Sequence, residues 1–368
     1  ILWIEVSHFR SASGVKSLAT IVGKLVHLER AMIPEEVMRA VQVKEYGSIE
    51  NVQIAEVATP SISDGQVLVK VQAASIGFVD GLKVQGLYQT KDTLPFTPGM
   101  EFAGVVEEVA ENTVGSASNL TRGMRVMGKA SNGGLAEYVA ARADDLHPLP
   151  DDVSFEVGAA FGTNYPTALY ALQARASLQR GECLLVLGAA GGTGTAAIQI
   201  GKLLGAHVIA AASTAEKRAF AERTGADAIV DYTRPDWRDA LKTATGGQGP
   251  DVIFDPVGGP ISEQAFRSIA WNGRHIVVGF ASGEIPALKF NLPLLKGGLL
   301  VGVDFAQIEQ REPAVLSQTN AQLMAWLEAD ALRPVVGKIF DFEDFHDAFR
   351  MMTDRSALGK MVIRIDAA

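Results

Sequence analysis

Short apolar runs separated by helical patterns fill the chain from about Tyr165 to Val303. Most of these runs lack an alternation of polar and apolar positions, which is typical of parallel strands that are buried on both faces. The expected strands are residues 183–187, 207–212, 228–232, 251–255, 275–279 and 299–303. Because helical patterns lie between them, the sequence predicts an α/β fold with a Rossmann-type, doubly wound sheet of six parallel strands over residues 165–303.

The residues before this region have a different pattern, in which short β-rich segments are separated by Gly, Pro and Asn. The clearest segments are QVLVKVQAASI (66–76), EFAGVVEEV (101–109) and TRGMRVMGKA (121–130). This pattern predicts a second, mostly β domain over residues 38–164. We expect residues 304–368 to return to that domain through a helix at 314–329 and a strand at 360–365.

The segment before Met38 fits the common targeting patterns poorly. Glu5 and Glu29 are unusual in a transit peptide, and no apolar core followed by a small-residue cleavage site marks a signal peptide. A clean strand-like pattern begins at Met38. We therefore expect residues 1–37 to be a tail outside the fold, and the pattern favours Met38 as the natural start. A targeting role is the alternative.

The first expected strand runs directly into the turn GAAGGTG (188–194), which is followed by a helical pattern. Set against the dinucleotide fingerprint, the three key positions are Ala189, Gly191 and Gly194. Gly191 lets the backbone approach a pyrophosphate, and Gly194 lets the helix pack closely on the strand. The N–H groups at the start of the helix then face the phosphates. The turn opens a six-strand α/β pattern, so it favours a nucleotide over a purely structural role.

The residues after the second strand indicate which nucleotide is bound. Enzymes that use NAD place an acidic residue about 20 residues beyond the glycines, where it binds the ribose 2′-hydroxyl. No acidic residue occurs from Thr195 to Ala215, and Lys217 and Arg218 follow. Two cations without a carboxylate favour the 2′-phosphate of NADP(H), although such cations are also typical of a solvated helix face.

Charge and composition narrow the classes of partner. The chain has 33 Lys and Arg against 42 Asp and Glu, a net charge of −9, which argues against a nucleic acid or an anionic membrane as partner. It has no apolar run of the ~18 residues that a membrane-spanning helix needs. The single cysteine, Cys183, allows neither an intramolecular disulfide nor a cysteine-rich zinc site. We expect a cytoplasmic protein, because such a chain suits a reducing compartment.

Three segments together resemble a known family. They are GAAGGTGTAAIQIGKLLGA (188–206), PDVIFDPVGGP (250–260) and GRHIVVGFASGEIPALKFNLPLLKG (273–297). They are similar to the zinc-free, zeta-crystallin-like quinone oxidoreductases of the medium-chain dehydrogenase/reductase superfamily. The resemblance implies a GroES-like catalytic domain over residues 38–164 and 304–368, an NADPH-binding Rossmann domain over 165–303, and a cleft between them. It also implies a homodimer, in which the sixth strand, LLVGV (299–303), pairs with its copy.

The resemblance assigns cofactor residues one by one. In this family a lysine after the second strand and a tyrosine after the third bind the 2′-phosphate, and Lys217 and Tyr232 match those positions. Further NADPH contacts are implied for Phe78, Thr167, Gly188, Ala190, Gly191, Gly192, Thr193, Ser213, Gly279, Phe280, Ala281 and Lys360.

Two departures concern metal and substrate. Zinc-dependent relatives have a His-Glu pair after a Pro-Gly, whereas Met100 stands here at the His position, so no metal site is expected. Family members usually carry Asn-x-x-Asp in the loop over the nicotinamide, and here Gly77 replaces the Asn while Asp80 is retained. We expect Asp80 to cap the helix that follows.

Three functions stay open from the sequence. Hydride transfer to a quinone needs little acid–base assistance and is the first choice. Reduction of the C=C bond of a 2-enoyl thioester or an alkenal is the alternative, because Asp80, Gly86 and Tyr88 match the Asp-x-x-x-x-x-Gly-x-Tyr motif of relatives that reduce such bonds. Tyr88 is then a proton donor, or else a half-buried loop aromatic. Tyr165 resembles a cleft residue or has a packing role. A non-catalytic NADPH-binding protein is the third possibility.

Overall fold

Six parallel strands form the sheet that the central part of the sequence predicts. The structure, a computed structural model, describes residues 36–111 and 119–365. The strands are β8 (Cys183–Leu187), β9 (His207–Ala211), β10 (Ala228–Val230), β11 (Val252–Asp255), β12 (Arg274–Val277) and β13 (Leu299–Gly302). Their order across the sheet is β10-β9-β8-β11-β12-β13. This is the order of a Rossmann fold, so the predicted architecture is confirmed, and a ligand crevice is expected where the order reverses between β8 and β11.

Alternate side chains of the central strands β8, β9 and β11 enter two different hydrophobic cores. In β8, Leu184 and Val186 join one core, and Leu185 and Leu187 join the other. The helices α5 (Gly192–Leu203) and α6 (Ala215–Arg223) contribute to the first core, and α7 (Trp237–Ala244), α8 (Pro260–Arg267) and α9 (Asn291–Lys296) contribute to the second. Apolar burial on both faces explains why these strands read as continuous apolar runs.

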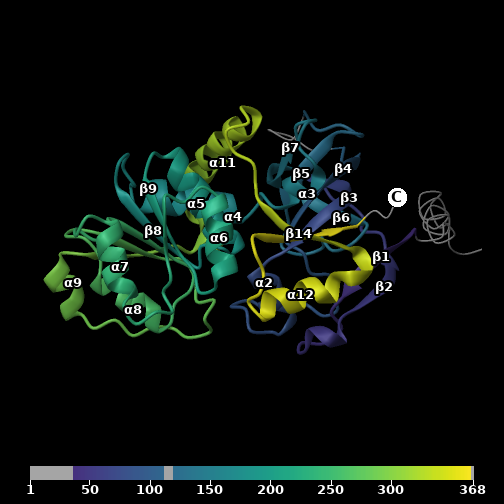
Figure 1. Cartoon of the computed structure of the whole chain (residues 1–368). Helices are drawn as coiled ribbons and strands as arrows, with labels where there is room; N and C mark the ends of the chain where they lie inside the picture. The colour runs from purple at the N-terminus through teal and green to yellow at the C-terminus, as the bar shows by residue number, and fades with distance from the viewer. Residues whose placement is uncertain (1–35, 112–118, 366–368) are drawn as a thin grey trace, which may run out of the picture. The chain divides into compact units, whose positions relative to one another are not determined.

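Both ends of the described chain contribute to a second, mixed sheet (Figure 1). Its strands are β3 (Gln66–Ile76), β4 (Glu101–Val109), β5 (Arg125–Lys129), β6 (Tyr138–Arg142), β7 (Leu146–Pro148), β14 (Val336–Asp341) and β15 (Lys360–Arg364), and β1 (Val37–Gln42) pairs with β2 (Gln53–Ala58). The strand β15 is antiparallel to β3, with Met361 opposite Ile76. This register brings Lys360, at the start of β15, to the end of β3.

Short helices connect these strands and flank the parallel sheet. They are α2 (Phe78–Val84), α3 (Phe155–Ala159), α4 (Asn164–Leu169), the π-helix η4 (Tyr170–Arg175), α10 (Ile308–Arg311), α11 (Pro313–Glu328), α12 (Phe345–Thr353) and the 3-10 turns η1 (Ile49–Asn51), η3 (Ala143–Asp145), η5 (Phe305–Gln307) and η6 (Phe342–Asp344).

The two elements expected near the C-terminus are both present. The expected strand is β15 and lies in the mixed sheet. The expected helix is α11, and it packs against α4 and η4, which precede β8. Its side chains Leu323 and Leu327 enter a core that both sheets share, because Leu184 of β8 and Ala103 of β4 belong to it. The return of the helix to the first domain therefore stays a prediction.

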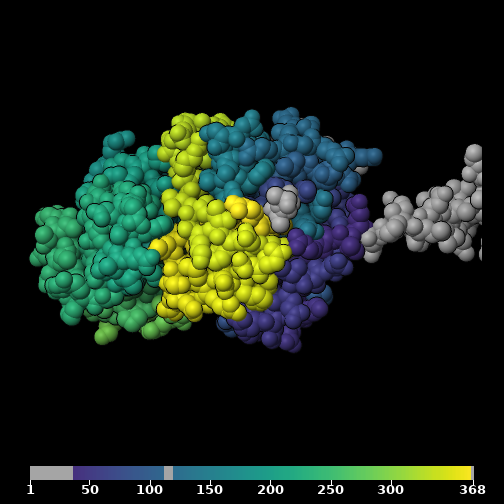
Figure 2. Space-filling model, turned by 45° about the vertical axis from the view of Figure 1, so that its right-hand side comes forward, coloured from purple at the N-terminus to yellow at the C-terminus, as the bar shows by residue number. Residues whose placement is uncertain are grey.

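The C-terminal residues lie where the two sheets approach each other. In Figure 2 these residues, in yellow, form the surface between the teal residues of the parallel sheet and the purple residues of the first strands. By their contacts, Met38–Ala368 form a single unit, so the expected boundary at residues 164 and 165 stays a prediction. The expected tail, residues 1–37, lies outside the described residues apart from its last two. None of the helices described here is both long and apolar enough to span a bilayer, and the cytoplasmic location stays a prediction.

Candidate cofactor site

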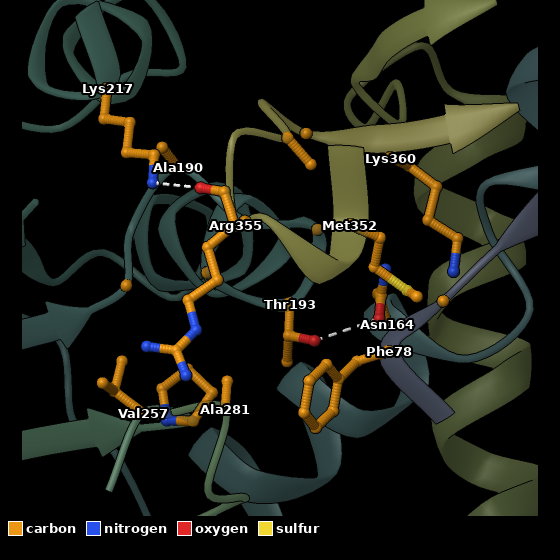
Figure 3. A pocket seen from close by; sticks show the side chains of 18 of the residues that line it. Phe78, Asn164, Ala190, Thr193, Lys217, Val257, Ala281, Met352, Arg355 and Lys360 are labelled. Atoms are coloured by element: carbon orange, nitrogen blue, oxygen red, sulfur yellow. Dashed lines mark hydrogen bonds between the residues drawn. The ribbon is translucent and has the colours of Figure 1, made fainter. Parts of the chain in front are cut away.

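A cavity of about 260 Å³ opens beside the carboxyl ends of β8, β9 and β11. Figure 3 shows that its walls come from the glycine turn after β8 and from the segment that joins α12 to β15. Ten of the residues predicted to bind the cofactor line it: Phe78, Gly188, Ala190, Gly191, Gly192, Thr193, Lys217, Tyr232, Ala281 and Lys360. The other predicted site residues, Thr167, Ser213, Gly279, Phe280 and Tyr88, are not among its lining residues.

The glycine turn has the geometry of a phosphate cradle. Gly188 has a φ of +59°, which L side chains rarely adopt. A Cβ on Gly194 would lie 2.4 Å from the Gly188 carbonyl oxygen, so the helix α5 can approach the strand only with glycine there. At Gly191 a Cβ would meet only that same oxygen, at 3.5 Å. Protein packing therefore does not explain the glycine at position 191, whereas a phosphate at the start of α5 would need the space. The residues present fit a dinucleotide.

Two cations face the cavity on the side of β9. The Lys217 ammonium donates to the Arg355 carbonyl oxygen at 2.5 Å (Figure 3). The Arg355 guanidinium donates to the Ser282 carbonyl oxygen at 2.6 Å. Arg218, the second cation of the sequence argument, instead pairs with Asp231 at 2.8 Å and is not among the lining residues. The described lining includes no Asp or Glu. This side of the cavity is therefore suited to an anionic group.

A buried chain of polar contacts forms the opposite side of the cavity. Thr193 donates its hydroxyl proton to the Asn164 Oδ1 at 3.1 Å. The neighbouring Thr163 donates its backbone N–H to the Glu101 Oε2 at 3.0 Å. The other oxygen of Glu101 pairs with the Lys360 ammonium, and both side chains are at most 5% exposed. These contacts join β4, β15 and the start of α4 to the glycine turn.

Asp80 organises the loop between β3 and α2. Its Oδ2 accepts the Gly77 N–H at 2.8 Å, and its Oδ1 accepts the Gly99 N–H at 3.0 Å. Burial raises the pKa of Asp80, and these backbone hydrogen bonds and the charge of Lys360 oppose the rise. The sequence placed Asp80 before the helix, whereas α2 begins at Phe78 and Asp80 lies in its first turn. Asp80 still contributes to the cap, because it accepts the N–H of Gly77, the residue that precedes α2.

The aromatic candidates lie apart from the cavity. Tyr165 is 3% exposed, donates to the Gln199 Oε1 at 2.6 Å, and stacks on Phe161 with ring centroids 5.8 Å apart. Burial raises its pKa, and these contacts assign it a packing role. Tyr88 is partly buried, and burial together with the charge of Asp304 raises its pKa.

The remaining predicted cofactor residues surround the cavity without lining it. Thr167 is buried in α4, and the Ser213 carbonyl oxygen accepts a hydrogen bond from Arg218 at 2.9 Å. Gly279 lies beside Pro256, because a Cβ there would be 3.6 Å from the Pro256 oxygen. Phe280 is 37% exposed and covers the turn at Gly258.

The chain lacks good zinc ligands at the position where zinc-dependent relatives bind the metal ion. Met100 offers a thioether in place of an imidazole. Cys183 is partly buried on β8, and burial raises the pKa of its thiol to about 12. Within residues 36–111 and 119–365, no three His, Cys, Asp or Glu side chains are grouped so that they could hold a metal ion.

Several lining residues escaped the sequence reasoning, among them Asn164, Met352 and Arg355. Arg355 lies 138 positions from Lys217 in the chain, and the two residues meet near the point where the Gly359 N–H donates to the Ala190 carbonyl oxygen. Arg355 lies five residues before Lys360, which was predicted to contact the cofactor. This closeness in the sequence was the one signal that could have pointed to Arg355.

Comparison with known proteins gives two family matches, "Alcohol dehydrogenase GroES-like domain" over residues 63–151 and "Zinc-binding dehydrogenase" over residues 192–321. The chain is 37% identical over 313 residues to "Quinone oxidoreductase-like protein 2" of Bos taurus, which covers 85% of this chain and 88% of that protein.

Solved structures agree with these matches. The quinone oxidoreductase from Thermus thermophilus, solved also in complex with NADPH, superposes with a TM-score of 0.76 at 33% identity, over 89% of this chain and all of that one. The CurK enoyl reductase superposes with a TM-score of 0.80 at 25% identity, over 89% of this chain and 99% of that one. With its Rossmann sheet, its glycine cradle and these similarities, the chain belongs to the quinone oxidoreductase family of the medium-chain dehydrogenase/reductase superfamily.

Proposed function

We propose that this NAD(P)-dependent oxidoreductase uses NADPH and transfers a hydride to quinones without a metal ion. One observation carries the choice of cofactor: Lys217 and Arg355 line the described cavity on the side of β9, and no carboxylate lines it. A carboxylate at the end of β9 would repel the 2′-phosphate of NADPH, whereas the lysine and the arginine there attract it. Tyr232, also in the lining, adds a hydroxyl donor.

Different groups of the chain would hold different parts of the cofactor. The first N–H groups of α5 receive the pyrophosphate, with Gly191 leaving the space. Lys217 and Arg355 donate to neutral carbonyl oxygens in this structure, and a phosphate dianion is the stronger acceptor for both. When bound, NADPH supplies a hydride to a two-electron acceptor. Phe78, Val257 and Met352 give the cavity an apolar wall that excludes water and suits a flat quinone ring.

The test compares NADPH with NADH at 340 nm, with a small quinone as acceptor. Replacing Lys217 by Ala should raise the KM for NADPH by at least about tenfold, because a charged hydrogen bond contributes about 1.5–3 kcal/mol, and should leave the KM for NADH unchanged. Lys202→Ala is the matched control, since Lys202 is an exposed lysine of α5 that pairs with Asp227. Equal use of both cofactors by the wild type would contradict the proposal.

Reduction of 2-enoyl thioesters or alkenals is the second candidate. The Asp80–Gly86–Tyr88 motif and the similarity to an enoyl reductase favour it. The same assay with an enoyl thioester decides, because oxidation with this substrate alone, lost in Tyr88→Phe, would replace the quinone proposal. Binding of NADPH, seen by fluorescence, with no turnover of either substrate would favour a non-catalytic NADPH-binding protein.

We also propose a homodimer formed through β13. This strand pairs only with β12 in the described sheet, so its other edge has free backbone donors and acceptors. Apolar side chains are exposed on and around it: Trp271, Ile285, Phe290, Leu294, Leu295, Leu299 and Leu300, each at least 48% exposed. A second copy is the fitting occupant, because a two-fold axis would pair β13 with itself and cover both apolar surfaces at once.

A further inference from the structure

The side chain of a lysine from another strand lies next to position 77. The family pattern has Asn at this position, and this chain has Gly77. A Cβ on Gly77 would lie 3.4 Å from the Lys360 Nζ and 3.4 Å from the Asp80 Oδ2. The ammonium of Lys360 therefore lies within contact distance of the point from which an Asn side chain would start.

Lys360 is held firmly in this place. The preceding residue, Gly359, donates its N–H to the Ala190 carbonyl oxygen at 2.7 Å and has a φ of +64°, so the start of β15 is fastened to the glycine turn. The aliphatic stem of the lysine then passes over that turn, because a Cβ on Gly192 would lie 3.5 Å from the Lys360 Cδ. The Glu101 carboxylate, itself anchored by the Thr163 N–H, accepts one hydrogen bond from the ammonium.

The Lys360 ammonium has more N–H groups than the hydrogen bond to Glu101 uses. An ammonium carries three N–H groups, and within residues 36–111 and 119–365 it donates to Glu101. Lys360 lines the cavity although it is only 4% exposed, and Phe78 and Asn164 line the same side (Figure 3). A cation in so dry a place interacts strongly with any charge that forms beside it.

We propose that Lys360 is a catalytic residue, which donates a hydrogen bond to the acceptor oxygen as negative charge develops there; this rests on the proposed quinone reduction. A quinone that gains a hydride becomes a hydroquinone monoanion, and a proton from solvent completes the hydroquinone while the cofactor leaves oxidised. Lys360 stabilises the anion and keeps its own proton. Gly77 leaves room for this lysine, because the outer atoms of a longer side chain there would extend beside its ammonium.

The test replaces Lys360 by Met and Glu101 by Gln in the same chain, so that no buried charge is left unpaired and the glutamine oxygen can still accept the Thr163 N–H. We expect kcat with a quinone to fall about 100-fold, the usual effect of losing one oxyanion donor. The Kd of NADPH, measured by fluorescence, should change less than about threefold. An unchanged kcat would overturn the proposal, and so would a loss of NADPH affinity with full activity at saturation.

Two further readouts separate catalysis from folding and from the proposed function. Gly77→Asn added to the double variant should recover about tenfold in kcat, because the amide N–H groups enter the space beside the former ammonium; its φ of −113° suits any residue. Independently of turnover, 4-nitrophenol bound with NADP⁺ should be held as the coloured phenolate by the wild type and as the phenol by the double variant. If the wild type does not turn over quinones, the proposed function fails, and the phenolate experiment still tests the lysine: equal colour in both proteins would overturn its role.

Discussion

Two alanine substitutions in one turn should have opposite effects on stability and on binding. Gly194→Ala places a Cβ 2.4 Å from the Gly188 oxygen and 2.8 Å from the Ala189 Cα. Both are backbone atoms that cannot rotate away, and the first contact is about 1 Å shorter than an ordinary van der Waals contact, so overpacking should cost about 3 kcal/mol. Alanine returns about 1 kcal/mol through helix propensity. The net loss should be about 2 kcal/mol.

Gly191→Ala is the matched partner. Its Cβ would meet only the Gly188 oxygen at 3.5 Å, and its φ of −79° is ordinary for alanine. This variant should keep the thermal midpoint of the wild type, whereas Gly194→Ala should lower it by about 4–8 °C. The Gly191 methyl group enters the space assigned to the pyrophosphate. It should therefore weaken NADPH binding by at least about tenfold, as measured by fluorescence titration.

The pair is decisive because each variant controls for the other. If Gly191→Ala binds NADPH like the wild type, the phosphates do not approach the backbone at this turn, and the cofactor cradle is misplaced. If Gly194→Ala unfolds at the same temperature as the wild type, the close contact of α5 with β8 is not what requires glycine. Either result would refute the steric argument for this turn.

Other consequences of the structure can be checked separately. Arg355→Ala should raise the Kd of NADPH about 10–100-fold and leave that of NADH unchanged, by fluorescence titration; equal losses would contradict a contact with the 2′-phosphate. Leu300→Lys should halve the mass measured by light scattering, because it puts a charge on the proposed dimer strand. Burial opposes ionisation of Glu182, but its hydrogen bonds to Arg274 and to the Gln179 N–H, together with the charge of Arg274, outweigh burial and lower its pKa below the ordinary 4.5. Ionised Glu182 therefore stabilises the folded protein above pH 4.5, and this stabilisation is lost as the pH falls through the lower pKa of the folded state. In Glu182→Gln the thermal midpoint should therefore fall less on acidification than in the wild type.

The parallel sheet could be predicted because its signals are local. Each strand is a short apolar run, and the turn 188–194 has glycines within one stretch. Strand ends were less certain: the segment expected over 121–130 is a strand only from Arg125 to Lys129, since Gly123 has a φ of +89° in the preceding turn. The elements against which α11 packs could not be predicted, because the apolar pattern of a helix does not say which core the helix enters.

Two contacts of the site could not be predicted, because each joins distant parts of the chain. Arg355 meets Lys217 where the start of β15 is bound to the glycine turn, and Lys360 lies beside Gly77 because β15 pairs with β3. Neither contact leaves a periodic or spaced signal in the sequence. The prediction for Arg218 failed because of a contact that the sequence does not show. Its position next to Lys217 suggested a phosphate contact, but its guanidinium forms an ion pair with Asp231.

The glycine at position 77 and the lysine at position 360 show why single departures from a family pattern are hard to interpret alone. From the sequence, Gly77 is simply the loss of an amide. In the structure the Lys360 ammonium lies beside this position, so a hydrogen-bond donor is present there without the amide, and it carries a positive charge. A neutral amide and a cation differ most when the acceptor becomes an anion, which is the moment of hydride transfer. An ammonium without a neighbouring amide would therefore favour acceptors that end as oxyanions, such as quinones, over those whose charge stays dispersed.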